Sequence, residues 1–418
     1  TMTTENNNKN LNVPNLRFPE FSGEWDRIKV SDLLEFYPTN SLSWEQLDYL
    51  DKGVFNLHYG LIHKGLPTQV DVSENSLPTI KEEYIPKKMS LCQRGDVAFA
   101  DASEDTNDVA KCIEFINCEN QKIVCGLHTI HGRDTQNKTV TGYKGYAFST
   151  HAFRDQIRRL AQGTKVYSIS SGNFSECYIG IPSKAEQSKI ANLLLAVDQR
   201  IAAQIKIIED LKKLKSAISN KLFARKDLLE KQITISEIGT LKNGYAFQSS
   251  TYNPAGSYKI ITIANVSGER YIDIDSCNCI MRIPEDIQTH QVLKQDDILI
   301  SLTGNVGRVS LCTEGNYLLN QRVGLLQLKT GVNREYIYQA LSFRRYEQTM
   351  ISCGQGAAQM NIGKGDVEDY TIPYSANSLN LEVVASTLKT YDLLISVEVD
   401  RLRLFIQQKQ YLLAQMFI

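Results

Sequence analysis

Few side chains of this sequence stand at spacings that would support catalysis. His128 and His131 lie three residues apart in a strand-like segment, with no third metal ligand beside them. Cys277 and Cys279 are equally isolated, whereas a structural zinc site needs four ligands, usually in paired spacings. The segment 363–365 (Gly-Lys-Gly) lacks the spacing and the hydroxyl of a phosphate-binding loop. We therefore expect no metal site and no catalytic residue, and the pattern favours binding.

The polar residues that could bind a ligand gather in glycine-rich loops. The segments 303–308 and 352–364 combine Gly with Asn, Gln, Arg or Lys, and 131–134 and 161–168 are similar segments of the first half. Gly lets the backbone approach a ligand closely. Asn and Gln can pair with adenine edges, and Arg and Lys can contact guanine or phosphate. These loops fit nucleic-acid contacts, although each taken alone also fits a simple turn that ends a strand.

The chain is a tandem repeat, and each half ends in a long helix with one apolar stripe. Apolar residues recur in steps of three and four over 190–222 and over 384–416, the spacing that keeps a stripe facing a partner helix. Asp198 and Asp392 take equivalent places, at an offset of 194. About 40 helical residues span roughly 60 Å, which is too long a stripe for a small domain to bury. We predict that the two helices pack together; separate docking of each helix on its own domain is the alternative.

The segments before the helices predict two mixed domains. Short apolar runs such as 258–264 and 323–328 alternate with helical stretches such as 334–348. The expected fold class is α+β, with two tandem domains each followed by a long helix. The expected boundaries are a disordered N-terminus over 1–15, a first domain over 16–183, a central helix over 184–226, a second domain over 227–375 and a C-terminal helix over 376–418.

Composition predicts a globular protein of the cytoplasm. The chain has 418 residues, 42% of them hydrophobic, enough for two to three domains, and no uncharged apolar run approaches the roughly 18 residues of a membrane span. The polar start, 1–10, gives no sign of a secretory signal, and nine scattered cysteines favour reduced thiols. The net charge of −1 argues against a nucleic-acid binder. The segment 184–226, however, holds ten Lys or Arg against four Asp or Glu, so a DNA contact would use local basic groups.

Taken together, these features resemble the specificity (S) subunits of type I restriction-modification systems. The resemblance covers essentially the whole chain and rests on the duplicated domain-plus-helix plan and on motifs of the first repeat. These motifs are 13–25 (VPNLRFPEFSGEW), 95–105 (GDVAFADASED), 126–130 (GLHTI), 163–169 (GTKVYSI), 181–190 (IPSKAEQSKI) and 211–215 (LKKLK) running to 222–223 (LF). The second repeat departs from the pattern, because 378–382 (SLNLE) stands where a Glu-Gln pair is usual, and its helix cap is in question.

The resemblance implies two target recognition domains at opposite ends of an antiparallel coiled coil formed by the two helices. Each domain would read a few base pairs of double-stranded DNA, and the helix pair would set the spacer of a bipartite target. Two modification subunits would dock on the helices, bind S-adenosylmethionine and methylate adenine. Two restriction subunits would add cleavage that depends on ATP and Mg. The chain itself would hold no cofactor and would not bind a membrane.

For the DNA contacts we predict loop positions in both domains. In the second domain they are Lys242, Asn243, Tyr245, Thr303, Asn305, Arg308, Gln355, Gln359 and Lys364. In the first domain they are Ser103, His131, Arg133, Lys165, Tyr167 and Ser168.

Two other functions stay open. A protein-interaction scaffold with tandem domains predicts no salt-dependent binding of duplex DNA. A cysteine-dependent hydrolase built on Cys92 or Cys125 with one of the histidines predicts that a single Cys→Ala change abolishes activity. Neither explains the duplication or the matched helices, whereas bipartite DNA reading explains both.

Overall fold

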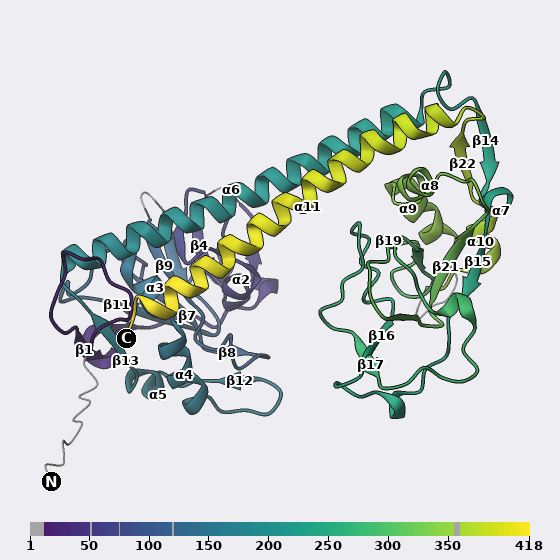
Figure 1. Ribbon diagram of the computed structural model, residues 1–418. Coiled ribbons are helices and arrows are strands. Elements are labelled where there is room, and N and C mark those ends of the chain that lie inside the picture. Colours follow the sequence, from purple (N-terminus) through teal and green to yellow (C-terminus); the bar gives the residue numbers. More distant parts are fainter. Residues whose placement is uncertain (1–11, 51, 75, 119–120, 355–359) are drawn as a thin grey trace, which may run out of the picture. The chain divides into compact units, whose positions relative to one another are not determined.

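The computed structural model describes residues 12–50, 52–74, 76–118, 121–354 and 360–418. Its contacts divide the chain into two units: the described residues up to Gln204 together with Arg401–Ile418, and Ile205–Asp400. Each unit combines short strands, short helices and segments of two long helices, α6 (Lys184–Phe223) and α11 (Ser378–Gln415) (Figure 1). This architecture confirms the predicted α+β class with tandem domains and long helices.

The first unit contains the sheets β1-β13, β10-β4-β6-β3, β2-β11-β7-β9-β5 and β12-β8. Its strands are β1 (Asp26–Lys29), β2 (Glu35–Tyr37), β3 (Leu47–Asp48), β4 (Val54–Leu57), β5 (Gln69–Asp71), β6 (Thr79–Ile80), β7 (Val97–Ala100), β8 (Ala102–Ser103), β9 (Cys112–Asn117), β10 (Lys122–Cys125), β11 (Thr129–Arg133), β12 (Tyr167–Ser168) and β13 (Tyr178–Ile181). Its short helices are α1 (Val30–Leu33), α2 (Tyr59–Lys64), α3 (Tyr143–Ala147), α4 (His151–Leu160) and α5 (Ser171–Ser175). Of the segment expected to be disordered, 12–15 is described, and the Trp25 amide donates to the Asn12 carbonyl at 2.7 Å.

The second unit contains the sheets β14-β22, β15-β21-β18-β19 and β17-β16-β20. Its strands are β14 (Lys231–Thr234), β15 (Gly239–Asn243), β16 (Tyr258–Ile261), β17 (Asn278–Ile280), β18 (Ile298–Ser301), β19 (Val309–Leu311), β20 (Tyr317–Leu319), β21 (Val323–Leu328) and β22 (Thr371–Tyr374). Its short helices are α7 (Ile235–Ile238), α8 (Arg334–Leu341), α9 (Arg344–Cys353) and α10 (Lys364–Glu368).

The two units share a structural frame that reflects the repeat. The strand pair β1–β13 in the first unit corresponds to β14–β22 in the second, and both pairs are antiparallel. The hydroxyl of Tyr143 donates to the Gly180 carbonyl on β13 at 2.7 Å. In the second unit Tyr336 donates in the same way to the Pro373 carbonyl on β22, and both members of this contact are displaced by 193 residues. The repeat therefore extends to single hydrogen bonds of the core.

Both long helices have N-terminal caps. At α6 the Glu186 amide lies 3.4 Å from the Ser183 hydroxyl, as in the Ser-x-x-Glu capping box that residues 183–186 match. At α11 the sequence lacks that motif, and Asn377 provides the cap instead: its side-chain oxygen accepts from the Leu379 amide at 3.0 Å. The cap that the sequence put in question is present, with a different residue.

The helices pair in antiparallel fashion through equivalent ion pairs. In the first unit Lys409 of α11 lies 2.6 Å from Asp198 of α6. In the second unit Lys215 of α6 lies 2.5 Å from Asp392 of α11. Each Asp and each Lys is related to its counterpart by the offset of 194. The predicted register of the repeat, and the packing of the two helices on each other, are confirmed.

Each unit also buries part of both helices in its own core. In the first unit Leu194 of α6 and Leu412 of α11 belong to the cluster around Phe99 and Tyr143. In the second unit Leu388 of α11 is fully buried in the corresponding cluster. Full burial of such a side chain is worth about 1.5–3 kcal/mol. The helices thus pack on each other and on the domains, so the two predicted alternatives are combined. No helix among the described residues is apolar over enough of its length to cross a membrane.

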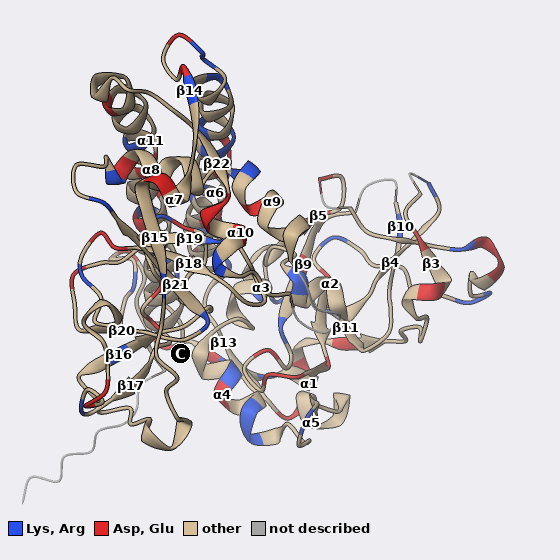
Figure 2. Ribbon diagram, turned by 90° about the vertical axis from the view of Figure 1, so that its right-hand side faces the viewer, with Lys and Arg blue, Asp and Glu red and all other residues tan. Residues whose placement is uncertain are grey.

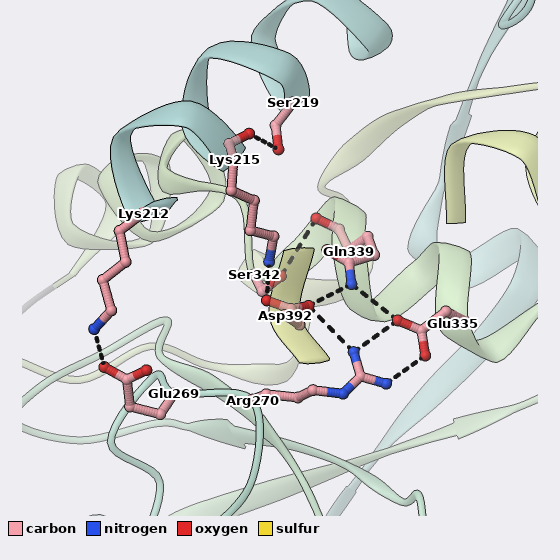
Figure 3. A network of polar contacts seen from close by, with 9 residues as sticks. All are labelled: Lys212, Lys215, Ser219, Glu269, Arg270, Glu335, Gln339, Ser342 and Asp392. Atoms are coloured by element: carbon pink, nitrogen blue, oxygen red, sulfur yellow. Dashed lines mark hydrogen bonds and ion pairs between the residues drawn. The ribbon is translucent and has the colours of Figure 1, made fainter. Parts of the chain in front are cut away.

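A polar network fastens the second unit to its helix segments (Figure 3). Arg270, in the loop before Tyr271, binds both carboxylate oxygens of Glu335 on α8 at 2.8 and 2.6 Å. The same guanidinium lies 3.2 Å from Asp392 of α11, which also accepts from Gln339 at 2.6 Å. Burial would raise the pKa of Glu335, but the hydrogen bonds from Arg270 and Gln339 outweigh it and hold this pKa below its usual value. The network therefore joins a loop of the domain, α8 and α11 by charge-assisted bonds.

Candidate nucleic-acid interface

The first unit brings four of the predicted residues together in a small ribbon. Strands β8 and β12 pair antiparallel, with Tyr167 opposite Ser103 and Ser168 opposite Ala102. Lys165 is exposed in the loop that leads into β12. The ribbon exists because the segment after β7 meets the loop after α4, two parts of the chain about sixty residues apart in sequence. Ser103, Lys165, Tyr167 and Ser168 thus form one cluster of polar groups.

The second unit has the same arrangement at the equivalent place. The loop after β18 meets the loop after α9: Thr303 forms an antiparallel bridge with Asn361, and the Gly304 amide donates to the Met360 carbonyl at 2.8 Å. Helices α4 and α9 begin at residues 193 positions apart. Asn305 is exposed in this loop and Lys364 is exposed at the start of α10. Two sets of loops that the sequence suggested separately are therefore the same structural element in each repeat.

Further polar residues line the same edge of the second unit's sheet. In β15-β21-β18-β19, Asn243 lies opposite Gly324, and Gly324 lies opposite Ile300, so β15 and β18 end where β21 begins. Beyond that edge the Gln321 amide donates to the Tyr245 carbonyl at 2.9 Å, and the Leu302 amide donates to the Arg322 carbonyl at 3.0 Å. The backbones of Tyr245, Gln321, Arg322, Thr303 and Asn361 are thereby tied in a row, which we call the edge row. Sequence reasoning missed Gln321, Arg322 and Asn361.

Gln321 and Arg322 have side chains suited to base contacts, but their position at the sheet edge is visible only in the structure. Asn320-Gln321-Arg322 connects β20 to β21, and both Gln321 and Arg322 are exposed. Amide and guanidinium groups between two apolar strands have the same composition as the loops that were chosen. Their short connection lacks the glycine that marks the other loops.

The other predicted residues of the second unit are placed less uniformly. Arg308 is half-exposed, with its Nε 3.5 Å from Glu347 on α9. Lys242 lines a cleft of about 560 Å³ with His290, Lys294 and Arg334, and side chains alternate along a strand, so it lies on the other face of β15 from Asn243. The hydroxyl of Tyr245 donates to Asp286 at 2.7 Å, and this bond raises the pKa of Tyr245. Gln355 and Gln359 lie outside the described residues.

His131 and Arg133 have structural partners away from the ribbon. The His131 side chain is fully buried on β11 and its Nε2 lies 2.7 Å from Asp96. Arg133 binds the same carboxylate at 2.7 Å and lies over the Tyr37 ring. Burial would raise the pKa of Asp96, but the bonds from Arg133 and His131 hold it below its usual value. Because the imidazole has no exposed atom, its assignment to the DNA contacts is corrected: His131 belongs to the core.

Charges of both signs are interspersed over both units (Figure 2), in keeping with the net charge of −1. An anionic ligand would therefore meet local groups and not a uniformly basic face. In the first unit such groups gather on α4, where Arg158 and Arg159 are exposed just before the ribbon loop. In the second unit Arg344 and Arg345 are exposed at the start of α9.

Comparisons with known proteins show which proteins the chain is similar to. Residues 230–402 match the family model of the type I restriction modification DNA specificity domain. The chain is 22% identical to a putative type I restriction enzyme MjaX specificity subunit from Methanocaldococcus jannaschii. The matched region covers 93% of this chain and 92% of that protein. Residues 230–402 thus match the type I specificity domain, and the chain as a whole is similar to a type I specificity subunit. This result confirms the resemblance drawn from the sequence.

Solved structures share the fold of this chain. The type I restriction-modification S subunit from M. genitalium has a TM-score of 0.55 and 15% identity, covering 97% of this chain and 99% of that one. A chain from a structural study of the assembly and conformational transition of the type I R-M system also has a TM-score of 0.55, at 14% identity, covering 93% and 96% of the two chains. The family model matches the second repeat of this chain, and the ribbon at β8 and β12 gives the first repeat the same local plan.

Proposed function

We propose that this chain reads a bipartite DNA target, one half-site per recognition domain, and directs adenine methylation and restriction by partner subunits. The observation that carries the proposal is the equivalence of the β8–β12 ribbon in the first unit and the Thr303–Asn361 bridge in the second. Both present exposed polar side chains from the same two loops. Two copies of one binding element on one chain fit a target in two parts.

The long helices support a spacer of fixed length in this proposal. At about 1.5 Å per residue, the 40 residues of α6 extend over roughly 60 Å. Half-sites read by a two-fold arrangement lie about 34–36 Å apart, one DNA turn, or a multiple of it. A helix pair of this length is long enough to set such a separation, and its paired register would keep the separation constant.

Partner subunits complete the proposed activity. The chain would contribute no catalytic group, S-adenosylmethionine would be bound by two modification subunits, and ATP and Mg by two restriction subunits, in the cytoplasm. Support for a docking surface comes from α11, where a second apolar row is not buried: Val383, Val397, Leu404 and Tyr411 are each more than half exposed. Their spacings of 14, 7 and 7 residues, all multiples of a heptad, place them along one side of the helix. An exposed apolar row on a helix is typical of a surface that binds another protein.

The decisive experiment is methylome sequencing of cells that express this chain with its neighbouring modification subunit. We expect methyladenine in a split motif with a fixed spacer. Replacing 231–375 by the same segment of another specificity subunit should change one half-site only. The exchanged segment should keep Arg270, Glu335 and Gln339, because Asp392 stays on α11 and needs these partners. No new methylation, with the modification subunit active and bound, would reject DNA reading and favour the scaffold.

Arg308 tests a single contact of the proposed interface. If its guanidinium pairs with a guanine, Arg308→Ala should weaken binding by about 1–3 kcal/mol and relax the sequence preference at one base pair. The measurement is binding of a set of singly substituted duplexes by the complex with the modification subunit. Lys329→Ala is the matched control, since Lys329 is exposed beyond the opposite end of β21. An equal loss for all duplexes would show a phosphate contact instead.

A further inference from the structure

Two cysteines and a histidine meet in the core of the first unit. Cys125 ends β10, His131 lies on β11, and the Cys92 amide donates to the Ile123 carbonyl at 2.8 Å, which brings Cys92 beside β10. The Sγ atoms of Cys92 and Cys125 are 3.6 Å apart. These two sulfurs and a ring nitrogen of His131 all lie within 4.8 Å of one another, and the three residues are buried. Their separation in sequence, from 92 to 131, concealed this cluster from motif analysis.

The histidine is oriented as metal-bound histidines are. Its Nε2 lies 2.7 Å from the Asp96 carboxylate, which Arg133 holds in place. A carboxylate partner keeps the proton on Nε2 and leaves Nδ1 with a free lone pair. Nδ1 of His131 is buried and has no hydrogen-bond partner among the described residues. A buried polar atom without a partner is costly, and a bound cation would satisfy it.

The geometry and charge of the cluster suit zinc. In a tetrahedral site with Zn–S bonds of about 2.3 Å, two sulfurs lie roughly 3.8 Å apart, close to the 3.6 Å between Cys92 and Cys125. Two thiolates and a neutral imidazole give a divalent ion no net charge, which is the condition for burying it among apolar residues such as Leu57 and Ile123. A disulfide between the two sulfurs would leave Nδ1 of His131 unexplained.

We propose that Cys92, Cys125 and His131 bind a zinc ion in the first recognition domain, with Asp96 as the positioning residue for the imidazole. A cleft of about 270 Å³ is lined by Cys125 together with Asn40, Pro86 and Met89, and it would give the ion a route from solvent. Three protein ligands leave a fourth position, which water from this cleft would fill. The ion would join β10, β11 and the segment before β7, and so stiffen the domain that carries the β8–β12 ribbon. This site is independent of the proposed DNA reading.

The test is metal content of the full-length chain, purified under reducing conditions, incubated with excess Zn²⁺ and freed of unbound metal. We expect about one zinc ion per chain, with a higher melting temperature than in the chelator-treated protein. Cobalt(II) in place of zinc should give the near-ultraviolet sulfur-to-metal absorption of a thiolate site. This second readout needs no variant, so it is unaffected if a substitution impairs folding.

Variants identify the ligands. Cys125→Ala and His131→Ala should weaken zinc binding at least 100-fold, and Asp96→Asn by about 10- to 100-fold through loss of orientation. Cys177→Ala is the matched control, because Cys177 is equally buried in the same unit but in the other core cluster. The proposal is overturned if the reduced wild-type chain retains no zinc and gives no cobalt–thiolate absorption. Equal loss of zinc in Cys177→Ala would also overturn it.

Discussion

Replacing Arg270 by Met should destabilise the second unit by about 3 kcal/mol. The guanidinium is nearly buried, and it is shared by the carboxylates of Glu335 and Asp392. Removing one partner of a buried ion pair typically costs about 3–5 kcal/mol, because the remaining charge has lost its water and its partner. Asp392 keeps Lys215 and Gln339, which places the expected loss at the lower end. Urea unfolding of the full chain, followed by a probe in the second unit, measures it.

Lys212→Met provides the matched control for this prediction. Lys212 pairs with Glu269, one residue before Arg270, but both side chains of that pair are about half exposed or more (Figure 3). Exposed pairs contribute about 0–1 kcal/mol, so Lys212→Met should change the free energy of unfolding by less than about 1 kcal/mol. Equal effects of the two substitutions would show that the Arg270 network is not a buried one in solution.

The cost of Arg270→Met should also depend on pH. In the wild type the pKa of Glu335 lies below its usual value. The stabilisation that ionised Glu335 contributes is therefore complete above the usual pKa of a glutamate, and it is lost as the pH falls through the lowered pKa. Without Arg270, burial would raise the pKa of Glu335, and its contribution would instead be lost as the pH rises. The difference in unfolding free energy between the two proteins should therefore shrink when the pH is lowered from 7 to 4. A difference that is constant over this range would contradict the assignment of Glu335.

The second large effect concerns assembly and rests on the proposed function. The double variant Val397→Lys and Leu404→Lys should lower the affinity for the modification subunit about 100-fold or more. Both side chains are more than half exposed in this chain, and a charge placed in an apolar protein interface loses the contacts of a hot spot and adds a desolvation cost. Calorimetric titration with the purified modification subunit gives the dissociation constant.

The same double variant should fold normally. Substitutions at exposed positions usually change stability by no more than about 0.5 kcal/mol, so an altered melting temperature would point to a structural role instead. Gln410→Lys is the control for charge, because Gln410 is exposed on another face of α11. Unchanged affinity in the double variant would show that the modification subunit docks elsewhere.

The sequence alone determined those features that repeat locally along the chain. The apolar stripes of α6 and α11 follow from helical periodicity, and the offset of 194 predicted the equivalence of Asp198 and Asp392. The lysine that pairs with each aspartate, Lys409 with Asp198 and Lys215 with Asp392, is seen only in the structure. Ser103 and Tyr167 were also predicted as contact residues of the same domain, and they are partners across β8 and β12. Periodicity, internal repetition and turn-forming residues are patterns of the sequence itself, so they can be recognised without the three-dimensional structure.

Only the tertiary structure decided which polar residues face solvent and which face the core. His131 and Lys165 looked alike as loop candidates, yet β11 carries His131 into the interior beside Asp96, whereas Lys165 is exposed. The edge row can be located only when the order of β15, β21 and β18 in the sheet is known, and that order is set by pairings between strands distant in sequence. The meeting of Cys92, Cys125 and His131 has the same origin. Strand pairing joins segments that are far apart in sequence, and a one-residue change of register reverses which side chains are buried. The local sequence pattern specifies neither the partner strand nor the register.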